Sequence, residues 1–229
     1  MNTEPDSLRL RPFQAVIFDM DGTVLDTESV FKTIVFEVCT DLGFEMTDAV
    51  HTSMVGSSHE RTNQLLVEAY GMAFPYTQFD ERCRISMHER THAGVPVKTG
   101  ARELLAELRE RNIPTAIATS SRSPHAHKHL GAVGLLDMFA TIVTRDDVIH
   151  PKPHPEPYLT AAARLGIDPL QCLALEDSPS GVRAAHAAGM QTIMVPDLVH
   201  PSAEIRALGI AIVESLDHVR HAAFPRVRS

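Results

Sequence analysis

Short apolar runs recur along the chain, and each ends at polar or turn-forming residues. The first run, AVIF at residues 15–18, is followed directly by DMDGT. Short runs rich in β-branched and aromatic side chains, bounded by such residues, predict buried strands. Five similar runs follow, at residues 115–119, 141–144, 172–176, 192–195 and, more weakly, 211–214. Apolar and polar positions do not alternate within them, which favours a parallel sheet buried on both faces.

Helical patterns separate most of these runs. The segment GARELLAELRER (residues 100–111) places its leucines on one face. Two alanine-rich segments, residues 156–166 and 179–189, each end at a glycine, which is a common residue just past a helix C-terminus. Strands that alternate with helices predict an α/β fold with a doubly wound, Rossmann-like parallel sheet.

The alternation of strands and helices is interrupted at residues 28–94. Its apolar spacing predicts three helices, at residues 29–42, 60–70 and 78–91, and no strand. We therefore expect an inserted, all-helical cap domain at residues 28–94. The catalytic core would consist of residues 12–27 and 95–229.

Polar residues follow the predicted strands at one edge of the sheet. In open parallel sheets, ligands bind beyond the carboxyl ends of the strands. The residues available there are acids, hydroxyls and one lysine: Asp19, Asp21, Thr119, Ser120, Lys152, Glu176 and Asp177. Four carboxylates beside one lysine would raise one another's pKa values, and a divalent cation would relieve that repulsion. A site made of oxygen ligands suits Mg²⁺, and the cation together with Lys152 would attract a phosphate dianion.

The motifs that contain these residues resemble those of a known superfamily. The runs AVIFDMDGTVLDTES, IATSS, KPHPEPY and LALEDSPSGVRAAHAAGM are similar, in content and order, to the four motifs of the haloacid dehalogenase superfamily. The helical insertion after the first motif resembles the capped subfamily that includes β-phosphoglucomutase and phosphatases of sugar and nucleotide phosphates. The resemblance covers residues 13–195, most of the chain.

This resemblance implies the roles of the two acids in the first motif. Asp19 would be the nucleophile, which forms an aspartyl-phosphate, and would also bind the metal. Asp21 would protonate the leaving group and then activate water, and its backbone carbonyl would bind Mg²⁺. Such roles suit phosphoryl transfer, which needs an in-line nucleophile and compensation of charge on the phosphoryl oxygens.

The same resemblance implies the roles of the remaining site residues. Asp177 would bind the metal through its carboxylate, with Glu176 beside it or acting through water. Thr119 and the backbone amide of Ser120 would hold the phosphoryl group. Lys152 would bridge Asp19 and the phosphoryl oxygens.

These expectations predict a Mg²⁺-dependent phosphatase that acts on a small phosphorylated metabolite, such as a sugar phosphate or a nucleotide-like monophosphate. Substrate selectivity is expected from the cap, where VGSSHER (residues 55–61) places Ser57, Ser58, His59 and Arg61. His59 and Arg61 are the predicted substrate-binding residues of this segment.

Three other functions are compatible with parts of the pattern. A phosphomutase similar to β-phosphoglucomutase would carry a cap histidine about where this chain has Phe31. A haloacid dehalogenase would need neither a metal nor Asp21. A non-catalytic phosphoacceptor or interaction module would lack the helical cap. Each of these readings fits the residues less well than a phosphatase does.

Composition narrows the range of partners. The formal net charge is −8, from 21 Lys and Arg against 29 Asp and Glu, and we expect no nucleic-acid partner because such binding needs a basic face. The three cysteines form no CxxC motif, so we expect buried thiols in a reducing compartment. The first residues lack the apolar core of a signal peptide, and no apolar stretch is long enough to span a membrane. We therefore expect a cytoplasmic protein, either a monomer or a weak homodimer.

Overall fold

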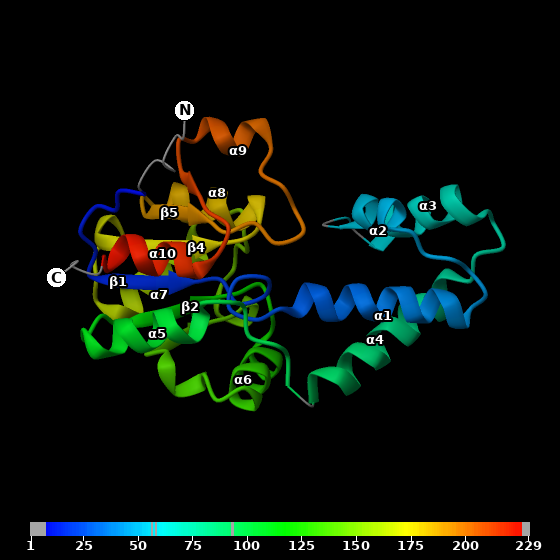
Figure 1. Cartoon of the computed structure of the whole chain (residues 1–229), viewed down its shortest axis with the longest axis horizontal. Coiled ribbons are helices and arrows are strands. Elements are labelled where there is room, and N and C mark those ends of the chain that lie inside the picture. Colours follow the sequence, from blue (N-terminus) through cyan, green and yellow to red (C-terminus); the bar gives the residue numbers. More distant parts are fainter. Residues whose placement is uncertain (1–7, 56, 58, 93, 226–229) are drawn as a thin grey trace. The chain divides into compact units, whose positions relative to one another are not determined.

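The structure forms two compact units (Figure 1). It is a computed structural model that describes residues 8–55, 57, 59–92 and 94–225. The first unit comprises the chain up to Leu25 and again from Pro96, and the second comprises Asp26–Val95. The helical second unit is thus inserted into the first one, directly after the first strand and its loop.

The first unit is built on a six-stranded sheet. Its strands are β1 (Ala15–Phe18), β2 (Thr115–Ala118), β3 (Thr141–Val143), β4 (Cys172–Glu176), β5 (Gln191–Met194) and β6 (Ala211–Ile212). Their order is β3-β2-β1-β4-β5-β6, and every neighbouring pair is parallel. The predicted doubly wound, Rossmann-like α/β fold is confirmed, and the observed strands end within two residues of the predicted limits.

Both faces of this sheet are buried. One face carries small side chains, such as Ala116 and Ala174, and packs in one cluster with alanines of α7 (Glu156–Leu165) and α8 (Pro179–Ala187). The residues that alternate with them along the strands are larger, and they are fully buried as well, as Phe18 and Ile117 show. Burial of both kinds of position explains why the strands show no polar alternation in the sequence.

The first unit contains further helices. These are α5 (Ala101–Glu110), α6 (Ser123–Ala132), α9 (Ala203–Ala207), α10 (Leu216–Ala223), and the 3₁₀ turns η1 (Leu136–Met138), η2 (Arg145–Asp147) and η3 (Pro169–Gln171). The leucine face of α5 is buried, as its spacing predicts. Across the part of the chain that the structure describes, we find no helix with the length and apolar character to cross a membrane. The three cysteines are buried free thiols, as predicted.

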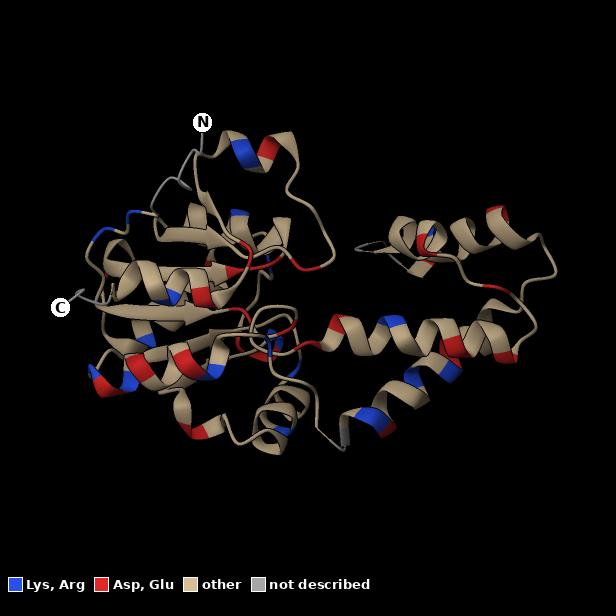
Figure 2. Ribbon diagram, in the orientation of Figure 1, with Lys and Arg blue, Asp and Glu red and all other residues tan. Residues whose placement is uncertain are grey.

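In its described residues the second unit consists of helices and loops, with α1 (Thr27–Asp41), α2 (Asp48–Met54), α3 (His59–Tyr70) and α4 (Tyr76–His92). Helix α1 packs along α4, and apolar side chains from this unit form a core of their own around Ile34, Leu66 and Phe74. Helix α4 carries charged residues along its length (Figure 2), and several of them are exposed: Glu81, Arg82, Arg84, Glu89 and Arg90. The unit therefore has a separate hydrophobic core and a solvated polar face.

Helix α2 is absent from the sequence-based prediction, which gives only three helices in this segment. It has seven residues, and only His51 and Met54 are buried in it. So short a helix does not repeat its apolar spacing, and its start is marked only by Thr47, whose side chain accepts a hydrogen bond from the backbone N–H of Val50. The pattern alone was too brief to indicate it.

Candidate active site

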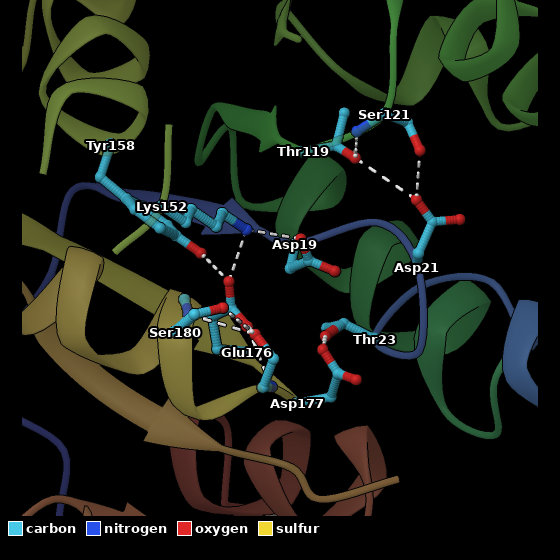
Figure 3. Close-up of polar contacts among 12 residues, drawn as sticks. Asp19, Asp21, Thr23, Thr119, Ser121, Lys152, Tyr158, Glu176, Asp177 and Ser180 are labelled. Carbon is cyan, nitrogen blue, oxygen red and sulfur yellow. Dashed lines mark hydrogen bonds and ion pairs between the residues drawn. The ribbon is translucent and has the colours of Figure 1, made fainter. Parts of the chain in front are cut away.

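The candidate site lies beyond the carboxyl ends of β1, β2 and β4. Asp19 follows β1, and Glu176 ends β4, which pairs directly with β1. The strand order reverses between these two strands, and open α/β sheets bind ligands at such a reversal. Thr119 follows β2, and Lys152 comes from the segment between η2 and α7. Figure 3 shows their side chains converging at this edge.

Lys152 is the centre of the site's charge network. Its Nζ lies 2.6 Å from Oδ1 of Asp19 and 2.5 Å from Oε1 of Glu176. Its side chain is only 4% exposed. Burial alone would lower the pKa of Lys152, but the two carboxylates outweigh it and hold that pKa above its ordinary value. The ammonium group therefore stays charged and fixed against Asp19.

Glu176 is held as tightly as the lysine that it contacts. Its Oε1 also accepts a hydrogen bond from the buried Tyr158 hydroxyl at 2.7 Å. Its Oε2 accepts from the backbone N–H and the hydroxyl of Ser178, at 3.1 and 3.0 Å. A Cβ atom at Gly181 would lie 1.6 Å from Oε1, so only glycine leaves room for this carboxylate.

Asp21 faces the hydroxyls that follow β2. Ser121 donates to its Oδ2 at 2.7 Å, and Thr119 donates to the same oxygen at 3.4 Å. The backbone N–H of Ser121 in turn donates to Oγ1 of Thr119. Ser120, predicted to hold the phosphoryl group through its amide, has an exposed side chain in the same turn. The structure therefore brings Asp21, Thr119 and Ser121 together.

Asp177 lies on the other side of the first loop. Thr23 donates to its Oδ1 at 3.4 Å, and Gly22 has a φ of +85°. A Cβ at Gly22 would lie 2.3 Å from Oδ2 of Asp177, so this close approach also requires glycine. Burial, together with the charges of Asp19 and Glu176, raises the pKa of Asp177 to about 9.

Burial also disfavours the ionised form of the Asp19 carboxyl group. Burial raises its pKa well above the ordinary value, Lys152 opposes that rise, and the charges of Glu176 and Asp21 add to it. Carboxylate oxygens of Asp19, Glu176 and Asp177 lie within 4.8 Å of one another. A buried group of oxygen donors with more carboxylates than cations fits a hard divalent ion, so the residues present suit Mg²⁺.

The two predicted cap residues lie at the start of α3 in the second unit. His59 lies 3.2 Å from Asp80, and its ring contacts the Tyr76 hydroxyl. Arg61 lies 3.2 Å from Glu68. Both side chains are exposed, whereas Gly56 and Ser58 of the same segment lie outside the described residues. The role of His59 and Arg61 in substrate binding stays a prediction.

Sequence reasoning missed two supports of the site. Tyr158 lies in the run KPHPEPY, but the sequence analysis assigns it no role. Gly181 lies in the run LALEDSPSGVRAAHAAGM and is likewise given no role, yet it makes room for Glu176. The Tyr158 contact joins two motifs that lie 18 positions apart, and the space at Gly181 becomes evident only once the Glu176 side chain is placed.

Comparison with known proteins agrees with this geometry. The model of the family described as "Haloacid dehalogenase-like hydrolase" matches residues 16–195. The chain belongs to this family. The resemblance inferred from the four motifs is thereby confirmed, and the protein is a hydrolase of the phosphatase type.

Individual relatives cover most of the chain. The phosphorylated carbohydrates phosphatase of Thermotoga maritima is 31% identical over 88% of this chain and 94% of its own length. Hexitol phosphatase B of Escherichia coli K12 is 31% identical over 81% of this chain and 85% of its own length. A HAD family hydrolase of Deinococcus radiodurans R1, solved with bound phosphate and sodium, superposes with a TM-score of 0.82 at 28% identity. That comparison covers 93% of this chain and 95% of the other.

We predict that Tyr158→Phe weakens both the fold and catalysis. The change removes the hydroxyl that donates to buried Glu176, and hydrogen bonds to charged groups contribute about 1.5–3 kcal/mol. The free energy of unfolding, measured with urea, should fall by about that amount. The kcat should fall as well, because Lys152 loses one of the groups that fix its partner.

Tyr70→Phe is the matched control, since the Tyr70 hydroxyl donates to the backbone carbonyl of Glu45 in the second unit. It should leave kcat unchanged. Equal kcat for Tyr158→Phe and the wild type would contradict a positioning role for Tyr158.

Proposed function

We propose that this protein is a Mg²⁺-dependent phosphatase that hydrolyses a small phosphorylated metabolite through an aspartyl-phosphate on Asp19. The observation that carries it is the buried contact between Lys152 and Asp19, at an edge where Asp21 and Asp177 also converge. Buried ion pairs add little net stability to a fold. We therefore attribute the burial of Lys152 to the binding of a dianionic substrate.

In the first half-reaction, a carboxylate oxygen of Asp19 attacks phosphorus and the phosphorus–oxygen ester bond breaks. Oδ1 of Asp19 contacts the Lys152 ammonium group, and Figure 3 shows the other oxygen of Asp19 pointing away from the lysine. The leaving alkoxide takes a proton from Asp21. Lys152 also offsets the negative charge on the phosphoryl oxygens, which is the main demand of phosphoryl transfer.

In the second half-reaction, water attacks the phosphorus of the acyl phosphate. Asp21 accepts the proton from that water, the bond between phosphorus and Asp19 breaks, and inorganic phosphate leaves. Thr119 and the amide of Ser120 would hold phosphoryl oxygens at this stage. The hydrogen bonds from Ser121 and Thr119 orient the Asp21 carboxylate for both proton transfers.

Asp19, Asp177 and the backbone carbonyl of Asp21 are the proposed ligands of Mg²⁺, which would neutralise charge on the substrate and on the acidic cluster. Glu176 is close enough to count among them. Its oxygens, however, already accept hydrogen bonds from Lys152, Tyr158 and Ser178. We therefore assign Glu176 a place beside the metal, where its chief task is to position Lys152.

Sugar and polyol phosphates are the proposed substrates. The relatives from Thermotoga maritima and Escherichia coli are phosphatases of carbohydrate and hexitol phosphates by name. The all-helical second unit, as a cap, would supply selectivity through His59 and Arg61, while the first unit supplies the chemistry. Phe31, 40% exposed on α1, offers no proton-transfer group, so a mutase that depends on a cap histidine is not proposed.

We predict that excess chelator abolishes turnover of a panel of sugar and polyol phosphates and that Mg²⁺ restores it. Calcium should support little activity, because its larger and looser coordination shell would misplace the nucleophile. Binding of Mg²⁺ must displace the proton held by Asp177, whose pKa of about 9 exceeds neutral pH. Calorimetry should therefore show proton release, and an affinity for Mg²⁺ that rises between neutral pH and about 9. Full activity in excess chelator would refute the metal assignment.

We predict that Asp21→Asn lowers kcat by about 10²–10⁴-fold on a sugar phosphate, as loss of a general acid and base does. The loss should be smaller on p-nitrophenyl phosphate, because p-nitrophenolate leaves without a proton. Steady-state kinetics on both esters measure this difference. Asp137→Asn makes the same chemical change at an exposed position and should leave both rates unchanged. A loss that is equal on the two esters would remove Asp21 from the acid role.

A further inference from the structure

A second cluster of possible metal ligands lies on the segment that carries Lys152. One nitrogen from each of His150 and His154 and one carboxylate oxygen of Glu156 lie within 4.8 Å of one another. The imidazoles are exposed, with side chains 62% and 50% accessible, whereas Lys152 between them is buried. The segment therefore directs its lysine into the catalytic site and its histidines to solvent.

Glu156 is fixed at the centre of this cluster. Its two oxygens accept hydrogen bonds from the backbone N–H groups of Ile149 and His150, at 2.8 and 2.9 Å. Nδ1 of His150 lies 2.8 Å from Oε2 of Glu156, and Nδ1 of His154 lies 4.0 Å from the same oxygen. The two backbone donors hold the Glu156 carboxylate in one orientation beside the histidines.

The backbone around these residues is restricted before any ion binds. Proline occupies every second position from Pro151 to Pro157, and each proline ring fixes its φ angle. The backbone N–H of Glu156 also donates to Nδ1 of His154, and the two imidazole rings lie with their centroids 4.6 Å apart. Ligands held this way lose less conformational entropy on binding.

We propose that His150, His154 and Glu156 form a site for a borderline transition-metal ion, with Zn²⁺ as the best match. Zn²⁺ binds two histidines and one carboxylate in a tetrahedral arrangement whose fourth position is left to water. Imidazole ligands also separate this site from the acidic cluster, because Mg²⁺ takes oxygen ligands and Zn²⁺ accepts nitrogen. The site would tie the loop before Lys152 to the first turn of α7, and its existence does not depend on the proposed phosphatase activity.

The test is calorimetric titration of the full-length protein with ZnCl₂ in saturating Mg²⁺. The wild type is compared with His150→Ala/His154→Ala and with the control His218→Ala/His221→Ala. The control removes two exposed histidines from α10, where the Nε2 atom of His221 faces the Arg220 guanidinium and is a poor zinc ligand. All three proteins keep the acidic cluster, so any zinc that binds there contributes equally to each titration.

The wild type and the control should each bind one more equivalent of Zn²⁺ than His150→Ala/His154→Ala. Thermal unfolding should show the same difference, since zinc that binds the native state raises the melting temperature of the wild type and the control further.

The single variants His150→Ala and His154→Ala should each weaken the extra site by more than the roughly 10–100-fold that loss of an outer-shell partner costs. Circular dichroism without zinc verifies that each variant is folded. Equal zinc stoichiometry in the wild type and His150→Ala/His154→Ala would overturn the proposal.

Discussion

The ion pair of the buried Lys152 with Asp19 and Glu176 is the interaction on which the rest of the site depends. A buried charge is tolerated only when it is paired and its hydrogen bonds are satisfied. Removal of one partner of a buried pair typically costs about 3–5 kcal/mol, because the other charge is left uncompensated. The surrounding residues meet this demand: Tyr158 and Ser178 satisfy Glu176, and Gly181 leaves space for it.

The position of this network follows from the topology of the sheet. Strands β1 and β4 are neighbours, so Asp19 after β1 and the acids at the end of β4 meet without any long loop between them. Strand β2, on the other side of β1, adds Thr119 and Ser121. The core unit therefore contains every residue proposed for the chemistry. The helical unit has a hydrophobic core of its own and is proposed to supply substrate selectivity.

At this edge of the sheet, acidic side chains outnumber the single lysine, and this excess of negative charge disfavours their ionised forms. Asp19 and Asp177 both have raised pKa values, chiefly because they are buried. A divalent cation would let both ionise, and Asp19 must be ionised to act as the proposed nucleophile. The histidine and glutamate cluster near Lys152 differs in kind, because its ligands are exposed and include nitrogen. The two sites are thus expected to select different metals.

Local patterns predicted most of the fold and predicted which residues meet at one edge of the sheet. The limits of the strand at Cys172–Glu176 were predicted to the residue, because an apolar run that meets acidic residues is an unambiguous signal. Asp19, Asp21, Lys152 and Asp177 follow from the four motifs. By contrast, α2 is too short to show a period.

Other features of the site had no local signal because they arise only in three dimensions. The hydroxyl of Tyr158 reaches Glu176 across 18 positions of sequence, and the space at Gly181 matters only beside that carboxylate. The hydrogen bond from Ser121 to Asp21 likewise joins two segments that are 100 positions apart. Such contacts are fixed by packing, so a sequence pattern cannot indicate them.

The most direct test of this account is to trap the covalent intermediate. The enzyme would be mixed with a ³²P-labelled sugar phosphate and Mg²⁺, quenched in acid within the first turnover, and its labelled peptide mapped by mass spectrometry. The account predicts that the label lies on Asp19, that hydroxylamine releases it as it does from an acyl phosphate, and that Asp19→Asn carries none. Label on another residue, or turnover that persists in Asp19→Asn, would contradict it.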